Sequence, residues 1–268
     1  MNQVRPAAVS GSFYPRQHQA LAQEVAALLG AAKQHQSVTP KALIAPHAGY
    51  IYSGPVAANA HALLEPARGR IKRVVLLGPA HFVAVQGLAL PDASGFATPL
   101  GVVQLDEASM ETLSRLPQVS QSNAAHASEH SLEVHLPFLQ TVLEKFTLVP
   151  LAVGDATPEE IADVLDLLWG GEETLIVVSS DLSHYLPYET ARRVDQATAQ
   201  AILDLREPIS HQQACGASPV NGLLLAAQRH CLIPELLDLR NSGDTAGDRS
   251  RVVGYAAFAF IESASHVH

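Results

Sequence analysis

Short apolar runs rich in β-branched residues recur along the chain, and stretches with the composition of helices lie between them. Runs without alternating polar residues are typical of strands buried on both faces of a sheet. Strands that alternate with helices predict an α/β fold in which helices cover both faces of a mainly parallel sheet. The expected strands are residues 42–45, 74–77, 148–153, 175–178 and 252–260.

Several of the intervening segments carry signals for the start of a helix. Thr157 precedes Pro158 and two glutamates, which is the order of an N-cap, a first-turn proline and first-turn acids. Ser218 before Pro219 repeats the pattern, and Ser131 is positioned to cap a further helix. The expected helices are residues 19–32, 54–64, 132–146, 158–168, 189–205 and 219–230.

The segment 86–105 differs from the rest because proline, glycine and short apolar pieces are mixed in it. This composition favours a hairpin. We therefore expect a mixed, mainly parallel central sheet rather than a purely parallel one. Since no internal repeat or long linker divides the chain, residues 1–268 are expected to form a single domain with a disordered tail at 260–268.

Composition narrows the classes of function. Hydrophobic residues make up 47% of the 268 residues, which is enough for a sizeable core. The net charge of −9 argues against a nucleic-acid partner and against a basic membrane-binding patch. Two cysteines are too few for a disulfide framework, and the chain has neither a signal-peptide pattern at its start nor an apolar run of about 20 residues. We expect a cytoplasmic protein with reduced thiols.

Polar residues with possible chemistry follow three of the expected strands. His47 comes after the first run, His81 after the second, and Asp181 and His184 after the fourth. Ligands of open α/β sheets bind beyond the carboxyl ends of the strands. One histidine alone would be an ordinary polar residue, but three strands that deliver such residues to one edge of a sheet predict a site there.

A fourth cluster of polar residues lies at 129–137. On a helix, Glu129 and Glu133 would share a face, whereas His130 and His135 would point in different directions. The spacing is therefore not that of a two-histidine zinc helix. The cluster is either the polar start of a helix or a source of one pocket histidine, and His130 is the better candidate because it lies nearer the loop.

Cys215 lies immediately before an expected helix start. A helix N-terminus favours the thiolate, so this position is expected to lower the thiol pKa. A thiolate is a strong ligand for zinc, copper or iron. The alternative is an inert buried thiol, for which Cys231, expected within a helix among apolar residues, is the better candidate.

These segments resemble the Memo family, whose bacterial members are labelled AmmeMemoRadiSam system protein B. Each motif alone is weak, but together they occur in order over nearly the whole chain. The matching segments are 11–15, 45–50, 77–81, 129–137, 178–184, and Cys215 and Gly216 followed by Pro219.

The resemblance implies a fold similar to the catalytic domain of class III extradiol dioxygenases, which are non-haem iron enzymes. It also implies a redox metal, iron or copper, bound by two histidines and one cysteine. The family's metal ligands correspond to His47, His81 and Cys215, and its further pocket residues to His130, Asp181 and His184. Animal relatives are described as binding phosphopeptides at this surface, but the chain lacks the arginine cluster that phosphate recognition uses.

The implied ligand set differs from that of non-haem iron oxygenases in its third member. Those enzymes use two histidines and one carboxylate, whereas the third ligand here would be Cys215. A thiolate from Cys215 shifts the preference toward Cu(I) or zinc, so dioxygenase activity does not follow from the fold. Asp181 is the alternative third ligand if Cys215 moves or is oxidised.

Three functions are compatible with these residues. The first is a metal-dependent, dioxygenase-like oxidoreductase acting on a small molecule or O2, in which His184 or His130 moves a proton and Asp181 orients one of them. The second is a non-catalytic protein that handles metal or binds a peptide or protein. The third is a zinc hydrolase with Glu129 or Glu133 as the base. Because family neighbours include a radical-SAM protein, a shared pathway with such a partner is conceivable.

Overall fold

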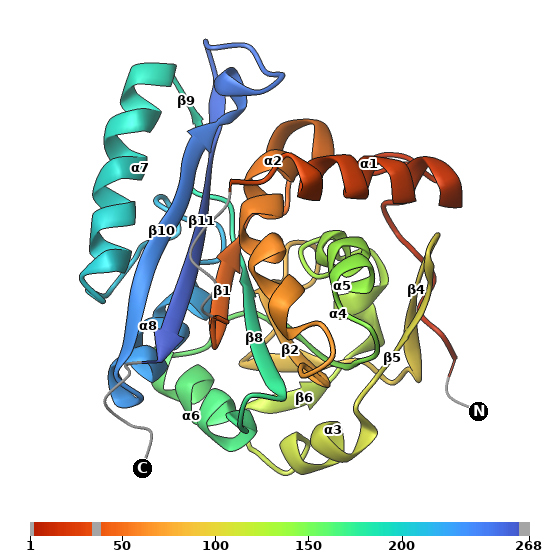
Figure 1. Ribbon diagram of the computed structural model, residues 1–268. Coiled ribbons are helices and arrows are strands. Elements are labelled where there is room, and N and C mark those ends of the chain that lie inside the picture. The colour runs from red at the N-terminus through yellow and green to blue at the C-terminus, as the bar shows by residue number, and fades with distance from the viewer. Residues whose placement is uncertain (1–2, 34–38, 263–268) are drawn as a thin grey trace.

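Four parallel strands form the centre of the sheet. They lie in the order β1 (Ala42–Ala45), β8 (Thr174–Ser179), β2 (Arg73–Pro79) and β7 (Thr147–Val153), and each pairs in parallel with the next. All four were expected from the apolar runs. Figure 1 shows them in the middle of the molecule, with helices on both sides.

The structure is a computed structural model, and it describes residues 3–33 and 39–262. Within these residues, nine strands form one sheet, whose outer strands are mostly antiparallel to their neighbours. The outer strands are β11 (Val252–Glu262) and β10 (Leu232–Asn241) beside β1, β9 (His184–Leu186) on β11, and β3 (Leu88–Leu90) and β6 (Val119–Gln121) beyond β7. The prediction of a mixed, mainly parallel α/β sheet is confirmed.

Two strand predictions need correction. β10 was not expected, because Pro234 and several charged residues interrupt its apolar pattern. It lies at the edge of the sheet, where proline is tolerated because one side of the strand has no partner. The expected disordered tail at 260–268 is wrong for residues 260–262, which belong to β11. Residues 263–268 lie outside the described residues.

The expected hairpin at 86–105 is confirmed. It consists of β4 (Gly95–Thr98) and β5 (Gly101–Gln104), which pair in an antiparallel sheet of their own. β3, at the start of the same segment, instead joins the main sheet antiparallel to β7.

One face of the sheet is covered by α6 (Pro158–Leu168), α7 (Tyr188–Leu203) and α8 (Ala217–Arg229). The bounds of α6 agree with the prediction, and its cap at Thr157 is the expected one, with a reciprocal hydrogen bond from Glu160. For α8 the expected cap is wrong. The N-cap is Gly216, and Ser218 lies inside the helix.

The other face is covered by α2 (Tyr50–His61) and α5 (Leu136–Val142), and α1 (His18–Gly30) packs on α2 (Figure 1). α2 begins four residues before its predicted start, so that Pro55 lies inside the helix, where its missing N–H removes one intrahelical hydrogen bond. The remaining short helices are η1 (Ala62–Ala67), α3 (Glu107–Leu113), α4 (Asn123–Ala127), η2 (Glu133–His135) and η3 (Ser242–Asp244).

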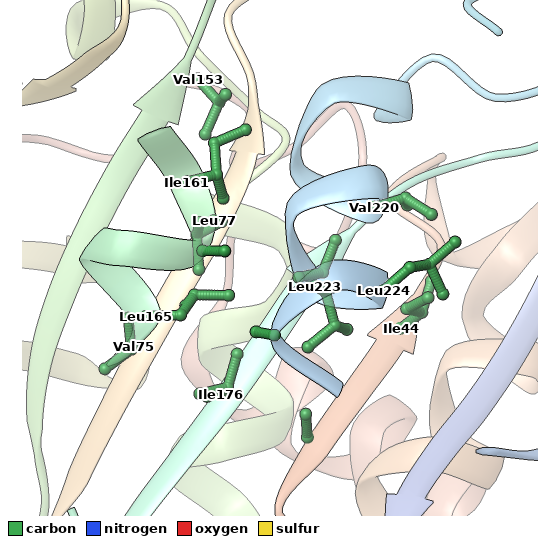
Figure 2. Packing of buried hydrophobic residues seen from close by; sticks show 14 of the residues in the cluster. Ile44, Val75, Leu77, Val153, Ile161, Leu165, Ile176, Val220, Leu223 and Leu224 are labelled. Carbon is green, nitrogen blue, oxygen red and sulfur yellow. The ribbon is translucent and has the colours of Figure 1, made fainter. Parts of the chain in front are cut away.

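Successive residues of the central strands point to opposite faces of the sheet and pack in two different apolar layers. Ile44 belongs to the layer beneath α6 and α8, whereas Leu43 belongs to the layer beneath α2 and α5. Figure 2 shows the first layer, in which Leu165 of α6 lies near Val75 and Leu224 of α8 lies beside Ile44. Because both faces are covered, the strands are apolar throughout, which is why they are visible in the sequence.

The expected helix at 132–146 is broken. Residues 129–132 are not helical, η2 is a single 3-10 turn, and α5 begins only at Leu136, followed by Pro137. Ser131 does not cap a helix, since its hydroxyl donates to the backbone oxygen of Pro79 at the end of β2. The loop at 129–132 is therefore attached to the sheet edge where the predicted site lies.

A buried ion pair fixes the N-terminal segment to this loop region. The guanidinium of Arg5 lies 2.5 Å from the carboxylate of Glu133, and both side chains are almost fully buried. Arg5 also donates to the backbone oxygens of His126 and Glu129, and Tyr14 donates its hydroxyl to Glu133. Removal of one partner from a buried pair leaves an uncompensated charge.

We therefore expect Arg5→Ala to lower the free energy of unfolding by about 3–5 kcal/mol. Urea denaturation followed by circular dichroism measures the change. The matched control is Arg115→Ala, which removes an exposed ion pair with Glu111 and should change stability by less than about 0.5 kcal/mol. Equal effects of the two variants would contradict a structural role for the buried pair.

His61 makes stability depend on pH. Burial lowers its pKa from 6.5 to about 4, because the charged ring would lose its hydration at the C-terminal end of α2, where it stacks on His135 and Phe138. Between these two values the unfolded chain binds a proton that the folded chain does not, so stability rises with pH. Stability is fully present above about pH 6.5 and is lost as the pH falls toward 4.

We expect this group to account for on the order of 3 kcal/mol of the loss between pH 6.5 and 4. Unfolding free energies of His61→Phe across this range should fall less steeply than those of the wild type. His18→Ala, which removes an exposed histidine, is the control and should retain the wild-type slope. The same slope in all three proteins would show that His61 does not titrate as described.

Candidate metal centre

The three parallel strands β1, β2 and β8 each deliver one polar residue to the same edge of the sheet. His47, His81 and Asp181 each lie two positions beyond the last residue of their strand. The rings of His47 and His81 are 5.2 Å apart between centroids and nearly perpendicular, at 72°. His47 Nε2 lies 4.0 Å from Asp181 Oδ2, and the backbone N–H of His47 donates to Asp181 Oδ1. The expected convergence is confirmed.

His130 joins this group from the loop before η2. One ring nitrogen from each of His47, His81 and His130 lies within 4.8 Å of the others. The rings of His81 and His130 are stacked, with centroids 4.7 Å apart and an interplanar angle of 16°. The structure thus brings together three histidines that could hold a metal ion, and it selects His130 rather than His135 from the fourth cluster.

His135 takes a different position. Its ring is completely buried, stacks on His61 at 5.4 Å between centroids, and contacts the hydroxyl of Ser179 through Nε2 at 2.9 Å. Burial lowers the pKa of His135 well below its ordinary value, so the ring is neutral at physiological pH. It lies behind the site rather than in it.

Cys215 reaches the group from the turn before α8. Its Sγ lies 3.3 Å from His47 Nε2, and its backbone N–H donates to the backbone oxygen of Asp181. The next residue, Gly216, packs closely against the end of β8. A Cβ on it would lie 2.6 Å from the backbone oxygen of Ser179, so only glycine fits there.

The protonation of Cys215 differs from the expectation. Burial raises the pKa of its thiol, and the nearby carboxylate of Asp181 raises it further. The expected effect of the helix N-terminus is too weak to offset these two, because Cys215 lies one residue before the N-cap. A thiolate at this position needs a bound cation, which is the condition under which coordinating thiols lose their proton.

Cys231 also differs from the expectation. It is exposed, has a positive φ of 53°, and lies between the end of α8 and the start of β10 rather than within a helix. The group of three histidines contains neither cysteine, but Cys215 Sγ lies 3.3 Å from His47 Nε2, whereas Cys231 is exposed at the far end of α8. The prediction that only Cys215 of the two is placed for metal binding is consistent with these positions.

Burial favours the neutral form of two of the three clustered histidines, His47 and His130. It lowers the pKa of His47 well below the ordinary value, and the neighbouring histidines lower it further. Burial likewise lowers the pKa of His130. Neutral imidazole is the form that binds metals, so these rings are ready to act as ligands at physiological pH.

Asp181 and His184 complete the set of expected residues. Burial raises the pKa of Asp181 to about 6, although hydrogen bonds from the His47 backbone and the charge of His184 lower it. His184 is exposed, and its Nδ1 donates to the backbone oxygen of Leu182. All six predicted site residues therefore lie in one region.

Glu129 was expected only as a possible hydrolytic base, and its contact with His81 was not anticipated from the sequence. Its side chain is almost fully buried and accepts hydrogen bonds from the His81 ring at Nδ1 and from the backbone N–H groups of His81, His130 and Ser131. Burial alone would raise its pKa, but these bonds outweigh it and hold the pKa at about 2. The carboxylate thus orients His81 with its Nε2 free, as carboxylates do behind metal-binding histidines.

Comparison with known proteins agrees with this geometry. The family model described as "Memo-like protein" matches residues 5–259. The chain belongs to the Memo family. A MEMO1 family protein of Aquifex aeolicus is 36% identical over 96% of this chain and 99% of its own length, and one of Archaeoglobus fulgidus is 35% identical over the same shares. A third Memo family relative, from Methanothermobacter thermautotrophicus, is 34% identical over 94% of this chain.

Membership in the Memo family agrees with the α/β architecture that the resemblance implied. Among the helices of the described residues, none combines the length and apolar character needed to cross a membrane. The donors at this site, three imidazoles with a thiol and a carboxyl close by, suit a transition metal better than calcium or magnesium, which prefer oxygen ligands.

The two cysteines provide a direct test of the third ligand. We expect Cys215→Ser to weaken metal binding by about 10-fold or more, because serine replaces a soft donor by a poor one. Cys231→Ser is the matched control and should bind as the wild type does. Titration of both apoproteins with Cu(I) and with Fe(II) against a competing chelator measures the affinities. Equal affinities of the two variants would remove Cys215 from the site.

Proposed function

We propose that this Memo family protein is a metal-dependent oxidoreductase that binds iron or copper through His47, His81 and Cys215 and acts on a small molecule. The observation that carries the proposal is the 3.3 Å separation of Cys215 Sγ and His47 Nε2, with the His81 ring 5.2 Å from the His47 ring between centroids. Two ligands of one tetrahedral metal, with bonds of about 2.0 Å to nitrogen and about 2.3 Å to sulfur, lie roughly 3.6 Å apart. The separation in the protein is close to this value.

The orientation of the rings supports His47 and His81 as the two histidine ligands. A ring nitrogen binds metal with a lone pair in the plane of the ring, and the planes of these two rings cross at 72°. The His130 ring also crosses the His47 ring at a steep angle, 84°. It is the hydrogen bond from His81 Nδ1 to the Glu129 carboxylate that favours His81 as the ligand. Asp181 Oδ2, at 4.0 Å from His47 Nε2, is farther away than Cys215 Sγ.

The remaining polar residues are placed to bind and to move protons. Bound iron or copper would supply one-electron chemistry, with open positions for substrate. His130 lies beside His81, and His184 has an exposed ring with a free Nε2, so either can exchange a proton with a ligand. Asp181 holds the backbone of His47 in place.

The site opens toward solvent at His81 and Phe82. The Phe82 side chain is 62% exposed, although it lies only 5.9 Å from the His130 ring between centroids. An exposed aromatic ring beside polar donors suits a ligand with both an apolar part and a polar group. The proposed substrate therefore is a small molecule of this mixed character.

A zinc hydrolase at this site would need Glu129 or Glu133 as its general base, and neither carboxylate is available. Glu129 is ionised and accepts four hydrogen bonds, and its pKa of about 2 makes it a poor proton acceptor at neutral pH. Glu133 is completely buried and is occupied by Arg5, Tyr14 and two backbone N–H groups. Neither carboxylate is free to activate water.

Metal content after purification without oxygen and without an affinity tag tests the proposal. The wild type should carry close to one iron or copper ion per chain, and the double variant His47→Ala, His81→Ala should carry almost none. The control is the double variant His18→Ala, His211→Ala, which removes two exposed histidines and should keep the metal.

Measurement of oxygen uptake by the metal-loaded protein then distinguishes an oxidoreductase from a protein that only binds the metal. Uptake that requires both the metal and an added substrate supports the oxidoreductase. Stoichiometric metal binding without turnover would overturn the catalytic half of the proposal and leave a metal-handling protein. Zinc in place of iron or copper, lost in the same variant, would overturn the redox half.

A further inference from the structure

One buried hydroxyl connects the metal centre to the core. Ser179, the last residue of β8, is completely buried, and its Oγ has three partners. His47 Nδ1 lies at 2.7 Å, His135 Nε2 at 2.9 Å and the backbone oxygen of Ser131 at 2.6 Å.

The chemistry of these partners decides which atom donates to which. A carbonyl oxygen can only accept, so the single hydroxyl proton of Ser179 goes to Ser131. The two lone pairs of the hydroxyl oxygen are then left to accept from His47 and His135. Both ring nitrogens that face Ser179 must therefore carry a proton.

We propose that Ser179 is a positioning residue that locks His47 in the Nδ1–H tautomer. In this tautomer the Nε2 lone pair is free, and it is Nε2 that lies 3.3 Å from Cys215 Sγ. The opposite tautomer would place a proton on Nε2, where a metal would have to displace it. The part of this inference that concerns metal affinity rests on the proposed function, whereas the tautomer itself does not.

Two further observations agree with the Nδ1–H tautomer of His47. His135 donates through Nε2, so its Nδ1 is a bare lone pair, and this atom is buried without a hydrogen-bond partner in the part of the chain that the structure describes. The acceptor of the Ser179 proton is also fixed. Ser131 is completely buried and is tied through its own hydroxyl to Pro79 and through its N–H to Glu129.

The two histidine ligands are therefore held by different groups. His81 donates to the carboxylate of Glu129, whose negative charge makes the ring a stronger electron donor. His47 donates to a neutral hydroxyl, which selects the tautomer without adding charge near the buried thiol of Cys215. This difference explains why a serine rather than a carboxylate stands at the end of β8.

The tautomer can be measured directly in the metal-free protein. In long-range 1H–15N NMR spectra of histidine-labelled apoprotein, the His47 signals are identified by their loss in His47→Gln. We expect a protonated Nδ1 and an unprotonated Nε2 in the wild type. Ser179→Ala should shift the population toward Nε2–H, because Nδ1 loses its acceptor. A proton on Nε2 of His47 in the wild type would contradict the proposal that Ser179 sets the tautomer.

Metal affinity provides the second readout. Titration with Cu(I) or Fe(II) should show a loss of about 10- to 100-fold in Ser179→Ala, the usual effect of removing a group that orients a ligand. Ser179→Thr keeps the hydroxyl and should restore both the tautomer and most of the affinity. Ser183→Ala is the matched control. It removes a completely buried hydroxyl from the loop after β8, on a residue that contacts Asp195 rather than His47.

The outcomes separate this inference from the proposed function. Wild-type protein that binds no metal would defeat the proposed function, while the NMR spectrum would still decide whether Ser179 sets the tautomer. Metal binding that is equally tight in Ser179→Ala and Ser183→Ala, with an unchanged His47 tautomer, would overturn the role of Ser179. Circular dichroism establishes that each variant is folded before either measurement.

Discussion

The parallel pairing of β1, β8 and β2 is the constraint on which the site depends. Parallel neighbours in register end at the same edge, so residues two positions beyond three different strands meet there. The covered faces of the sheet make this edge rigid. The paired strands therefore bring the rings of His47 and His81 to 5.2 Å between centroids.

Buried hydrogen bonds fix the orientation of the histidine rings that meet at this edge. Glu129 and Ser179 each lie behind one histidine, and each is saturated by partners from more than one segment of the chain. A buried polar group without partners would be destabilising, so the network that orients the rings also stabilises the loop that carries His130. The ion pair of Arg5 with Glu133 extends this network to the N-terminal segment.

The strands were predictable because each is apolar over its whole length, as burial on both faces requires. The helix α6 was predictable because its cap, proline and glutamates are local signals. β10 was not, because it lies at the edge and its charged residues and Pro234 hide the pattern. The helix expected at 132–146 failed because contacts of Ser131 and Glu129 with distant residues outweigh local helix propensity.

By itself, the sequence determined the order of the central strands and of most of the helices that cover them, and placed His47, His81 and Asp181 just beyond strand ends. Local periodicity is sufficient for that, since it reports which segments are buried. Only the tertiary structure decided that His130 rather than His135 enters the site, and that Glu129 is fully occupied. It also decided that the thiol of Cys215 is protonated without a cation. These properties depend on burial and on partners more than 30 residues away in the chain, which no local pattern encodes.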